Sequence, residues 1–237
     1  MKATIIFLHG GPGFKDYLKP FFTELNDRFD CIFYDQARGP KVVLEDLLSQ
    51  LDEIVCSLSG KIILLGHSWG GVLAIEYAAR NQAKLSGLVL MSTCLCYTHW
   101  KDEFNKEKLN LGLVNAGVEK IFLAPDEVKE GKAFLDSTWR TFSEETFASL
   151  NKSYIGKFDV TPLLKGLKIP VLNIFGEKDV RCPARVAKTF RLFKEDMIDF
   201  QIPDAGHFPF LQNSGRLQIY KILTENCDKN LMGVEMV

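Results

Sequence analysis

The sequence predicts an α/β fold in which helices flank a mostly parallel sheet and a short helical insertion covers the sheet edge. Three observations predict it. Short apolar runs alternate with amphipathic runs along most of the 237 residues, which is typical of βα units. One unit passes from strand to helix on a serine flanked by glycines. A long segment with helical periodicity and no strand pattern interrupts the alternation after the fourth strand.

The first half of the chain supplies most of the expected sheet. Four short apolar runs are expected to form buried strands: residues 3–8, 30–35, 61–66 and 85–92. Three amphipathic runs are expected to form the helices between them or after them: residues 16–29, 42–59 and 69–80. The second helix has its apolar residues on one face and is closed by Gly60, a residue typical of helix C-termini.

The second half contains the insertion and the rest of the sheet. Residues 169–176 and 197–203 are expected strands, and residues 183–193 and about 217–226 are expected helices. We therefore expect a core made of residues 1–96 and 158–237. Residues 97–157 are rich in aromatic side chains and are expected to form a helical lid, because long insertions in compact domains are usually functional. Extra surface helices without a lid function are the alternative.

Composition limits the partners and the compartment. The formal net charge of −1 gives no reason to expect nucleic acid or an anionic membrane as a partner. No apolar run reaches the roughly 18–20 residues of a membrane-spanning helix, and the N-terminus lacks a signal-peptide pattern. Six cysteines without a C-x-x-C pair favour reduced thiols and a cytoplasmic location. The oligomeric state stays open.

The serine corner is the strongest functional signal. Ser68 lies in GHSWG, a G-x-S-x-G match between an expected strand and an expected helix. Gly66 and Gly70 allow a sharp turn that exposes the hydroxyl, and the helix that begins at Trp69 favours negative charge there. This context predicts Ser68 as a nucleophile. An incidental serine in a Gly-rich turn is the alternative.

A serine nucleophile needs a base, and the chain has four histidines. His67 is adjacent to Ser68, so its side chain is expected to point away and pack. His9 is expected to form a hydrogen bond within its loop, and His99 is expected to be exposed. His207 follows the last expected strand, at the end of the sheet where open α/β folds build their sites. We therefore predict His207 as the general base.

The base in turn needs a carboxylate on its other ring nitrogen. The loop after the fifth strand, GEKD, offers Glu177 and Asp179. We predict Asp179, because it lies further into the loop and precedes the expected helix at Pro183. A helix cap or turn residue is the alternative role for Asp179, and Asp204 is a rival acid close to the base in sequence.

The expected first strand ends in HGGPG, residues 9–13. Glycines there let the backbone approach a substrate and direct N–H groups at it. We predict an oxyanion hole made by the backbone N–H groups of Gly11 and Trp69, the residue after the serine. An ordinary Gly-Pro turn is the alternative.

Four motifs in order, HGGPG, GHSWGG, GEKD and AGHFPF, resemble the α/β-hydrolase superfamily. HGGPG together with YDQARGP and GHSWGG is most similar to the proline iminopeptidase branch. The resemblance implies an α/β-hydrolase fold, a Ser–Asp–His triad, no cofactor, and release of an N-terminal residue, often proline, from short peptides.

The sequence departs from that branch in several places. Ala37 interrupts the usual Asp-Gln-Arg-Gly run, the chain begins directly at the HGGPG strand, and the insertion is shorter than the branch's cap. That cap normally supplies carboxylates for the substrate's amino group. Five acidic residues of the insertion are the candidates, with solvated helix charges as the alternative: Asp102, Glu103, Glu107, Glu144 and Glu145.

The residues together predict a serine hydrolase that cleaves a small ester through an acyl-enzyme, with no cofactor and no metal. The aromatic insertion predicts an apolar pocket for the acyl or alcohol part of a small molecule. An iminopeptidase-type aminopeptidase acting on short peptides is the alternative. From other classes, a non-catalytic ligand-binding scaffold, or an enzyme of acyl transfer or carbon–carbon cleavage, stays open.

Overall fold

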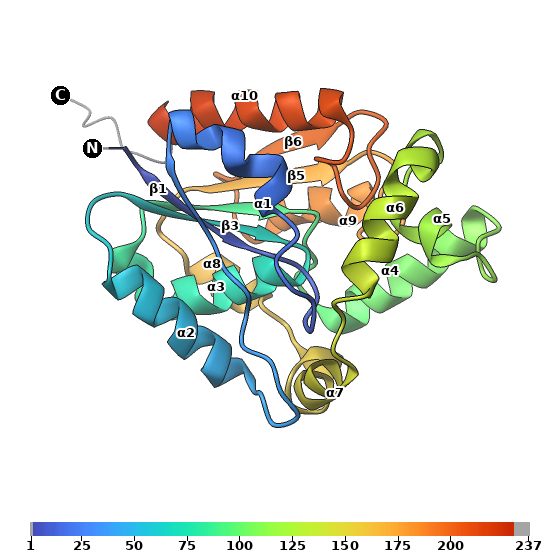
Figure 1. Cartoon of the computed structure of the whole chain (residues 1–237), viewed down its shortest axis with the longest axis horizontal. Helices are drawn as coiled ribbons and strands as arrows, with labels where there is room; N and C mark the ends of the chain where they lie inside the picture. The colour runs from blue at the N-terminus through green and yellow to red at the C-terminus, as the bar shows by residue number, and fades with distance from the viewer. Residues whose placement is uncertain (1, 230–237) are drawn as a thin grey trace.

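The centre of the protein is a six-stranded parallel sheet with the order β2-β1-β3-β4-β5-β6 (Figure 1). The computed structural model describes residues 2–229, apart from the side chains of residues 128–130, so the expected core ranges 1–96 and 158–237 extend outside it at residue 1 and at residues 230–237. The strands are β1 (Thr4–Leu8), β2 (Asp30–Phe33), β3 (Ile62–His67), β4 (Gly87–Met91), β5 (Val171–Gly176) and β6 (Ile198–Ile202). The predicted parallel α/β fold is confirmed.

Helices cover both faces of the sheet (Figure 1). In β1, Ile6 and Leu8 point to one face and Ile5 and Phe7 to the other, because side chains alternate along a strand. The face of Ile6 is covered by α2 (Leu44–Cys56), α3 (Trp69–Asn81), α8 (Thr161–Gly166) and α9 (Ala184–Lys188). The face of Phe7 is covered by α1 (Lys19–Phe22) and α10 (Asn213–Lys229). None of the helices within residues 2–229 is both long enough and apolar enough to cross a lipid bilayer.

The first helix is shorter than the sequence predicts. Instead of residues 16–29, α1 covers only Lys19–Phe22, and a 3-10 turn over Thr23–Asp27 follows it. Pro20 lacks a backbone N–H and fits only the first turn of a helix, so the helix cannot begin at residue 16. The last helix is longer than expected, and α10 extends beyond residues 217–226 at both ends.

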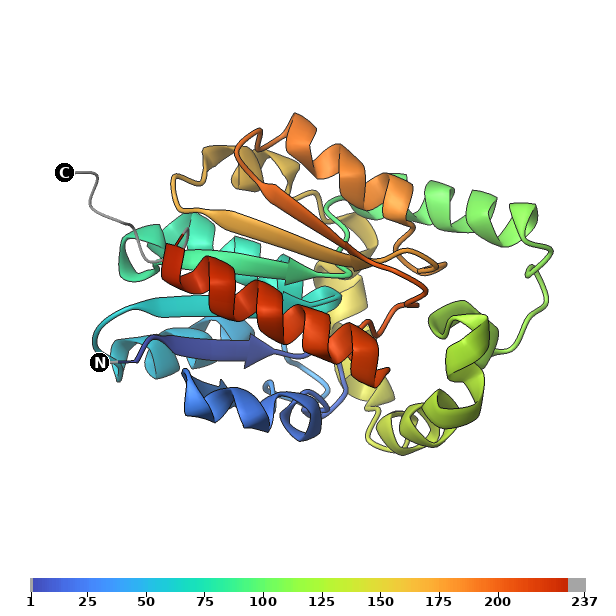
Figure 2. The same ribbon diagram turned by 90° about the horizontal axis from the view of Figure 1, so that it is seen from above.

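The insertion between β4 and β5 is helical, as predicted. It contains α4 (Tyr97–Asn110), α5 (Val118–Phe122), α6 (Val128–Trp139) and α7 (Glu144–Ser153), gathered at the carboxyl ends of the strands (Figure 2). Its two ends lie side by side. The Tyr97 N–H donates to the Phe158 carbonyl at 2.9 Å, and the Val160 N–H donates to the Leu95 carbonyl at 2.8 Å. Residues 97–157 therefore leave and re-enter the core at one point.

The strand order brings two distant loops together. β1 pairs with β2 on one side and with β3 on the other, so the chain leaves β1 and β3 in opposite directions. In open α/β sheets such a reversal creates a crevice beyond the carboxyl ends of the strands. The loop after β1 and the serine corner after β3 meet there.

Candidate active site

Ser68 occupies the corner between β3 and α3 in a backbone conformation that few residues adopt, with φ 53° and ψ −119°. The corner is closed by contacts that only glycine allows. A Cβ on Gly66 would lie 2.3 Å from the Gly70 carbonyl oxygen, and one on Gly70 would lie 2.0 Å from the Leu8 carbonyl oxygen. The glycines of GHSWG therefore let α3 pack against β1 and hold the serine at the sheet edge.

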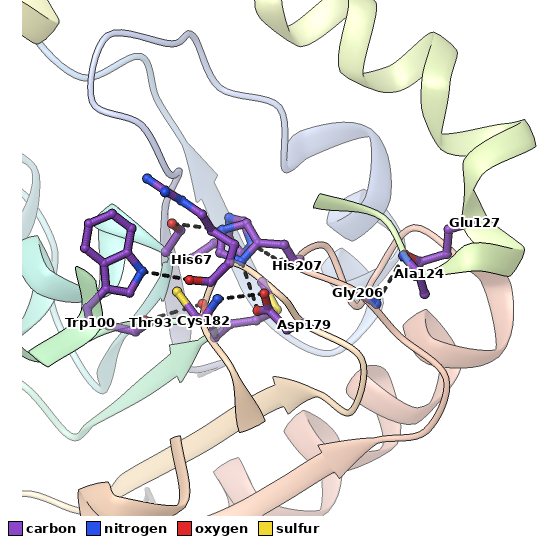
Figure 3. Close-up of polar contacts among 12 residues, drawn as sticks. His67, Thr93, Trp100, Ala124, Glu127, Asp179, Cys182, Gly206 and His207 are labelled. Atoms are coloured by element: carbon purple, nitrogen blue, oxygen red, sulfur yellow. Dashed lines mark hydrogen bonds and ion pairs between the residues drawn. The ribbon is translucent and has the colours of Figure 1, made fainter. Parts of the chain in front are cut away.

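Three predicted side chains from three loops form one hydrogen-bonded line. The Ser68 hydroxyl lies 3.1 Å from His207 Nε2. His207 Nδ1 lies 2.9 Å from Asp179 Oδ2 (Figure 3). A carboxylate only accepts, so Nδ1 carries the proton and Nε2 is left to accept from the serine. Asp179 Oδ1 also accepts from the Cys182 N–H at 2.8 Å. Asp179 therefore positions the imidazole of His207 and also stabilises the turn in which Asp179 lies.

The two rival acids lie away from the imidazole ring. Asp204 is exposed and pairs with Lys178, at 2.6 Å. Glu177 accepts from the Asp204 N–H at 3.1 Å. Both carboxylates therefore belong to the surface of this loop, whereas Asp179 is buried beside His207.

His67 does more than pack. Its Nε2 donates to the His207 carbonyl oxygen at 2.8 Å, so Nδ1 is free to accept from the Tyr17 hydroxyl at 2.6 Å. The Tyr17 oxygen in turn accepts from the Gly10 N–H at 2.8 Å. Burial lowers the pKa of His67 well below its usual value, so the ring stays neutral. This series of hydrogen bonds joins the loop after β1 to the loop of His207. No local sequence pattern identifies Tyr17 as its centre.

His9 forms hydrogen bonds within its loop, as the sequence predicts, and binds Gln36 as well. Burial lowers the pKa of His9 to about 4, and its Nδ1 donates to the Gly10 carbonyl at 2.8 Å. Gln36 donates to the His9 carbonyl at 2.7 Å and accepts from the Trp69 indole at 3.2 Å. Gln36 thus ties the loop after β1 to the first residue of α3. Its place in the YDQARGP motif is the signal that could have identified it.

The predicted oxyanion donors, Gly11 and Trp69, border the same small cavity as Ser68. Within residues 2–229, neither of their backbone N–H groups donates to another group of the chain. A Cβ on neighbouring Gly10 would lie 2.3 Å from the Tyr17 hydroxyl and 3.1 Å from Ser68 Cβ. Glycine there keeps the loop close to the serine.

Two chambers open beside Ser68. The larger is about 180 Å³ and is bordered by His207 and a group of aromatic side chains. These side chains come from the insertion or from the loops after β1 and β6: Phe14, Tyr17, Phe122, Trp139, Phe142, Phe147 and Phe208. The smaller is about 60 Å³ and lies between Trp69 and Trp100. Arg181, which no sequence motif singles out, borders both chambers.

The five acidic residues of the insertion that were candidates for binding an amino group lie elsewhere. None of the five borders either chamber. Glu103 and Glu107 both contact Arg185 in α9. Asp102, Glu144 and Glu145 are exposed. They fit the alternative of solvated or surface-paired helix charges.

An unpredicted carboxyl group joins the insertion to the loop of His207. Glu127 Oε2 accepts from the Ala124 N–H at 2.7 Å and from the Gly206 N–H at 3.2 Å (Figure 3). Its Oε1 is buried without a partner among the described residues. Burial raises the pKa of Glu127 to about 7. A lone Glu in an aromatic segment gives no sequence signal for this contact.

The donor set of Asp179, Cys182 and His207 is the one group of metal-ligand type that the described residues bring together, with ligand atoms within 4.8 Å of one another. Its chemistry is poorly suited to a metal. The Asp179–His207 hydrogen bond occupies Nδ1, and contact with the Cys94 thiol raises the pKa of Cys182, which keeps that thiol protonated.

Comparison with known sequences agrees with this architecture. Residues 5–217 match the sequence model of the alpha/beta hydrolase family. A proline iminopeptidase of Saccharolobus solfataricus is 40% identical over 101 residues, which are 38% of this chain and 33% of that protein. The match therefore spans about a third of that relative. A pimeloyl-(acyl-carrier protein) methyl ester esterase of Wigglesworthia glossinidia brevipalpis is 28% identical and covers 89% of both chains.

Solved structures show the same fold. A thermophilic esterase from Thermogutta terrifontis superposes with a TM-score of 0.76 at 20% identity, over 98% of this chain and 92% of that one. An esterase from Exiguobacterium antarcticum superposes with a TM-score of 0.74 at 18% identity, over 96% of this chain and 92% of that one. The resemblance that the four motifs carry, including that to the proline iminopeptidase branch, is confirmed by the sequence matches.

Proposed function

This chain belongs to the alpha/beta hydrolase family, and from that membership we propose that it is a serine hydrolase which cleaves a small ester through an acyl-enzyme. The observation that carries the proposal is the line of hydrogen bonds from Ser68 through His207 to Asp179. An alcohol, an imidazole and a buried carboxylate in this order are the groups that acyl transfer requires.

In the first step the Ser68 oxygen attacks the ester carbonyl carbon, and His207 Nε2 takes the hydroxyl proton. The imidazolium that forms is stabilised by the Asp179 carboxylate, which also fixes the ring orientation. The carbonyl oxygen becomes an oxyanion, and the N–H groups of Gly11 and Trp69 are the donors placed beside Ser68 to receive it.

In the second step the tetrahedral intermediate collapses and the bond to the alcohol oxygen breaks. His207 returns its proton to the leaving alkoxide, which departs as the alcohol and leaves an acyl group on Ser68. A water molecule then attacks the acyl carbon while His207 accepts its proton. Collapse of this second intermediate returns the proton to Ser68 and releases the acid.

We further propose that residues 97–157 act as a lid. Several side chains of this segment border the larger chamber, among them Phe122, Trp139 and Phe142. They cover the serine with apolar surface, which excludes water and accommodates an acyl or alcohol group.

An iminopeptidase-type aminopeptidase is the second candidate, and the match to the proline iminopeptidase supports it. A free amino group needs an acidic partner. The described residues place no Asp or Glu on the wall of either chamber beside Ser68. Ester cleavage is therefore the function that the site supports best.

Labelling with a fluorophosphonate probe tests the proposal, together with turnover of short p-nitrophenyl esters and of Pro-p-nitroanilide. We expect wild-type protein to be labelled and to prefer the esters. Ser68→Ala should lose the label and lower kcat by about 10⁶, because the three residues act as a unit. Ser59→Ala, at an exposed position before β3, is the matched control and should behave as wild type.

Labelling that persists in folded Ser68→Ala would remove this serine from the mechanism. Folded wild-type protein without any label would instead favour a non-catalytic binding scaffold. Turnover of the proline anilide but not of the esters would favour the aminopeptidase.

A further inference from the structure

Arg181 is a cation in the wall of the site. It follows Asp179 by two residues, in the loop between β5 and α9, and it borders both chambers that open at Ser68. No other Lys or Arg borders either chamber among the described residues. A substrate bound with its carbonyl at Ser68 therefore meets this one charge.

Aromatic rings of the insertion hold the side chain of Arg181. Its Cζ atom lies 4.2 Å from the centroid of the Trp100 ring, 4.9 Å from that of Phe104 and 5.7 Å from that of Phe122. The Trp100 indole also donates to the Arg181 carbonyl oxygen at 2.7 Å. Rings that stack on a guanidinium leave its N–H edge free for a planar anion.

The guanidinium of Arg181 has no anionic partner among the side chains that the structure describes. No carboxylate among the described side chains, which leave out those of residues 128–130, lies within ion-pair distance of it, and its N–H groups donate to no described acceptor. Asp179, whose charge acts on it, is engaged by His207 and by the Cys182 N–H. Burial lowers the pKa of Arg181, yet arginine stays charged at any physiological pH. Arg181 is partly buried, and a partly buried cation without an anionic partner is stabilised when a ligand completes it.

We infer that Arg181 receives an anionic group of the substrate, so that the substrate is an ester that also carries a carboxylate, such as a half ester of a short dicarboxylic acid. The inference rests on the proposed function and names the substrate class of that site. Arg181 orients the ester by a charge-assisted, bidentate hydrogen bond, while the aromatic wall contacts the methylene groups between the two ends.

The size of the chambers limits the substrate. A cavity of about 150 Å³ accommodates a molecule of the size of benzene. The larger chamber here is about 180 Å³. It accommodates an acyl chain of a few carbons, which places short dicarboxylic half esters ahead of long acyl chains.

The test compares two methyl esters of nearly equal shape and different charge. Monomethyl glutarate carries the carboxylate, and methyl 4-carbamoylbutanoate replaces it with a neutral amide. We expect wild-type kcat/KM to be about 10–100-fold higher for the anionic ester, since a hydrogen bond to a charged group is worth that factor. Methyl 4-phosphonobutanoate as a third ester distinguishes a site for carboxylates from one for phosphonates and phosphates.

Arg181→Gln removes the charge and keeps much of the side-chain length. It should lower kcat/KM for monomethyl glutarate by about 10–100-fold and that for the neutral amide by less than about threefold. Arg181→Lys should retain part of the preference, because a lysine is a point charge without the fork. Arg191→Gln removes an exposed positive charge and should leave both values unchanged.

Equal kcat/KM for the two esters in the wild type would overturn the inference and leave the serine hydrolase intact. The inference would also be overturned if Arg181→Gln lowered kcat/KM by the same factor for both esters. The role of Arg181 would then be limited to its stacking on Trp100. If folded wild-type protein neither reacts with the fluorophosphonate probe nor hydrolyses any of the esters, the proposed function itself fails.

Discussion

The imidazole of His67 donates a hydrogen bond from Nε2 to the backbone carbonyl oxygen of His207, 2.8 Å away. The residue before the serine therefore positions the loop of the predicted base. The same ring accepts from the Tyr17 hydroxyl, whose oxygen accepts from the Gly10 N–H. One neutral, buried network thus couples the position of His207 to the loop after β1.

Removing one hydroxyl should loosen this network. Tyr17→Phe leaves the Gly10 N–H and His67 Nδ1 without partners, which should lower the free energy of unfolding by about 1–3 kcal/mol. We also expect kcat to fall by about tenfold, because both loops at Ser68 lose a positioning contact. Urea denaturation and ester turnover measure the two effects.

Tyr34→Phe is the matched control for that change. The Tyr34 hydroxyl is buried without a hydrogen-bond partner among the described residues, so its loss should leave stability unchanged or raise it. A Tyr17→Phe protein as stable and as active as the Tyr34→Phe protein would show that the network contributes to neither stability nor turnover.

The choice of acid can be tested with two isosteric changes. Asp179→Asn should lower kcat by about 10⁴, because an amide no longer holds the imidazole of His207 in the required tautomer. Asp204→Asn should have little effect, since Asp204 is exposed and pairs only with Lys178 at the surface. Steady-state turnover of one short ester by both variants decides between them. A larger loss in Asp204→Asn would mean that Asp179 is the turn residue and not the orienting acid.

Glu127 should make stability fall as pH rises through neutrality. Burial is the main cause that raises the pKa of its carboxyl to about 7, and Asp179 and Asp126 add to it. Between about pH 4.5 and 7 the folded protein keeps a proton that the unfolded chain has released. The free energy of unfolding should therefore decrease over this range, by an amount on the order of 1–3 kcal/mol.

Glu127→Gln should flatten that slope, because its amide oxygen can still accept from the Ala124 and Gly206 N–H groups without titrating. Urea unfolding of both proteins between about pH 5 and 8 measures the difference. Glu53→Gln, which changes an exposed residue of α2, should keep the wild-type slope. Parallel wild-type and Glu127→Gln curves would show that Glu127 is already ionised at acidic pH.

The serine corner should not tolerate a side chain at Gly70. In Gly70→Ala the new Cβ would lie 2.0 Å from the Leu8 carbonyl oxygen, so α3 must move away from β1. We expect a loss of about 1–3 kcal/mol in unfolding free energy and weaker fluorophosphonate labelling. Gly166→Ala is the control, because its Cβ meets no atom within 4 Å. Equal stability of the two variants would contradict the packing argument.

Local pattern predicted much of the fold. Strands and long helices such as α2 carry their periodicity in neighbouring residues, and the Gly-rich corner at Ser68 needs small residues that are visible in the sequence. The prediction of the first helix was wrong. It relied on the apolar periodicity of residues 16–29, although Pro20 cannot lie in the interior of a helix.

The sequence by itself determined the order of the strands along the chain, the serine corner and a short set of candidates for its partners, because each depends on residues adjacent in the chain. Only the tertiary structure decided which carboxylate meets His207 and placed Tyr17, Glu127 and Arg181 at the site. Those contacts join loops after β1, β3, β5 and β6 with the insertion. No local pattern encodes them, because the parallel strand order and the packing of the helices bring these segments together.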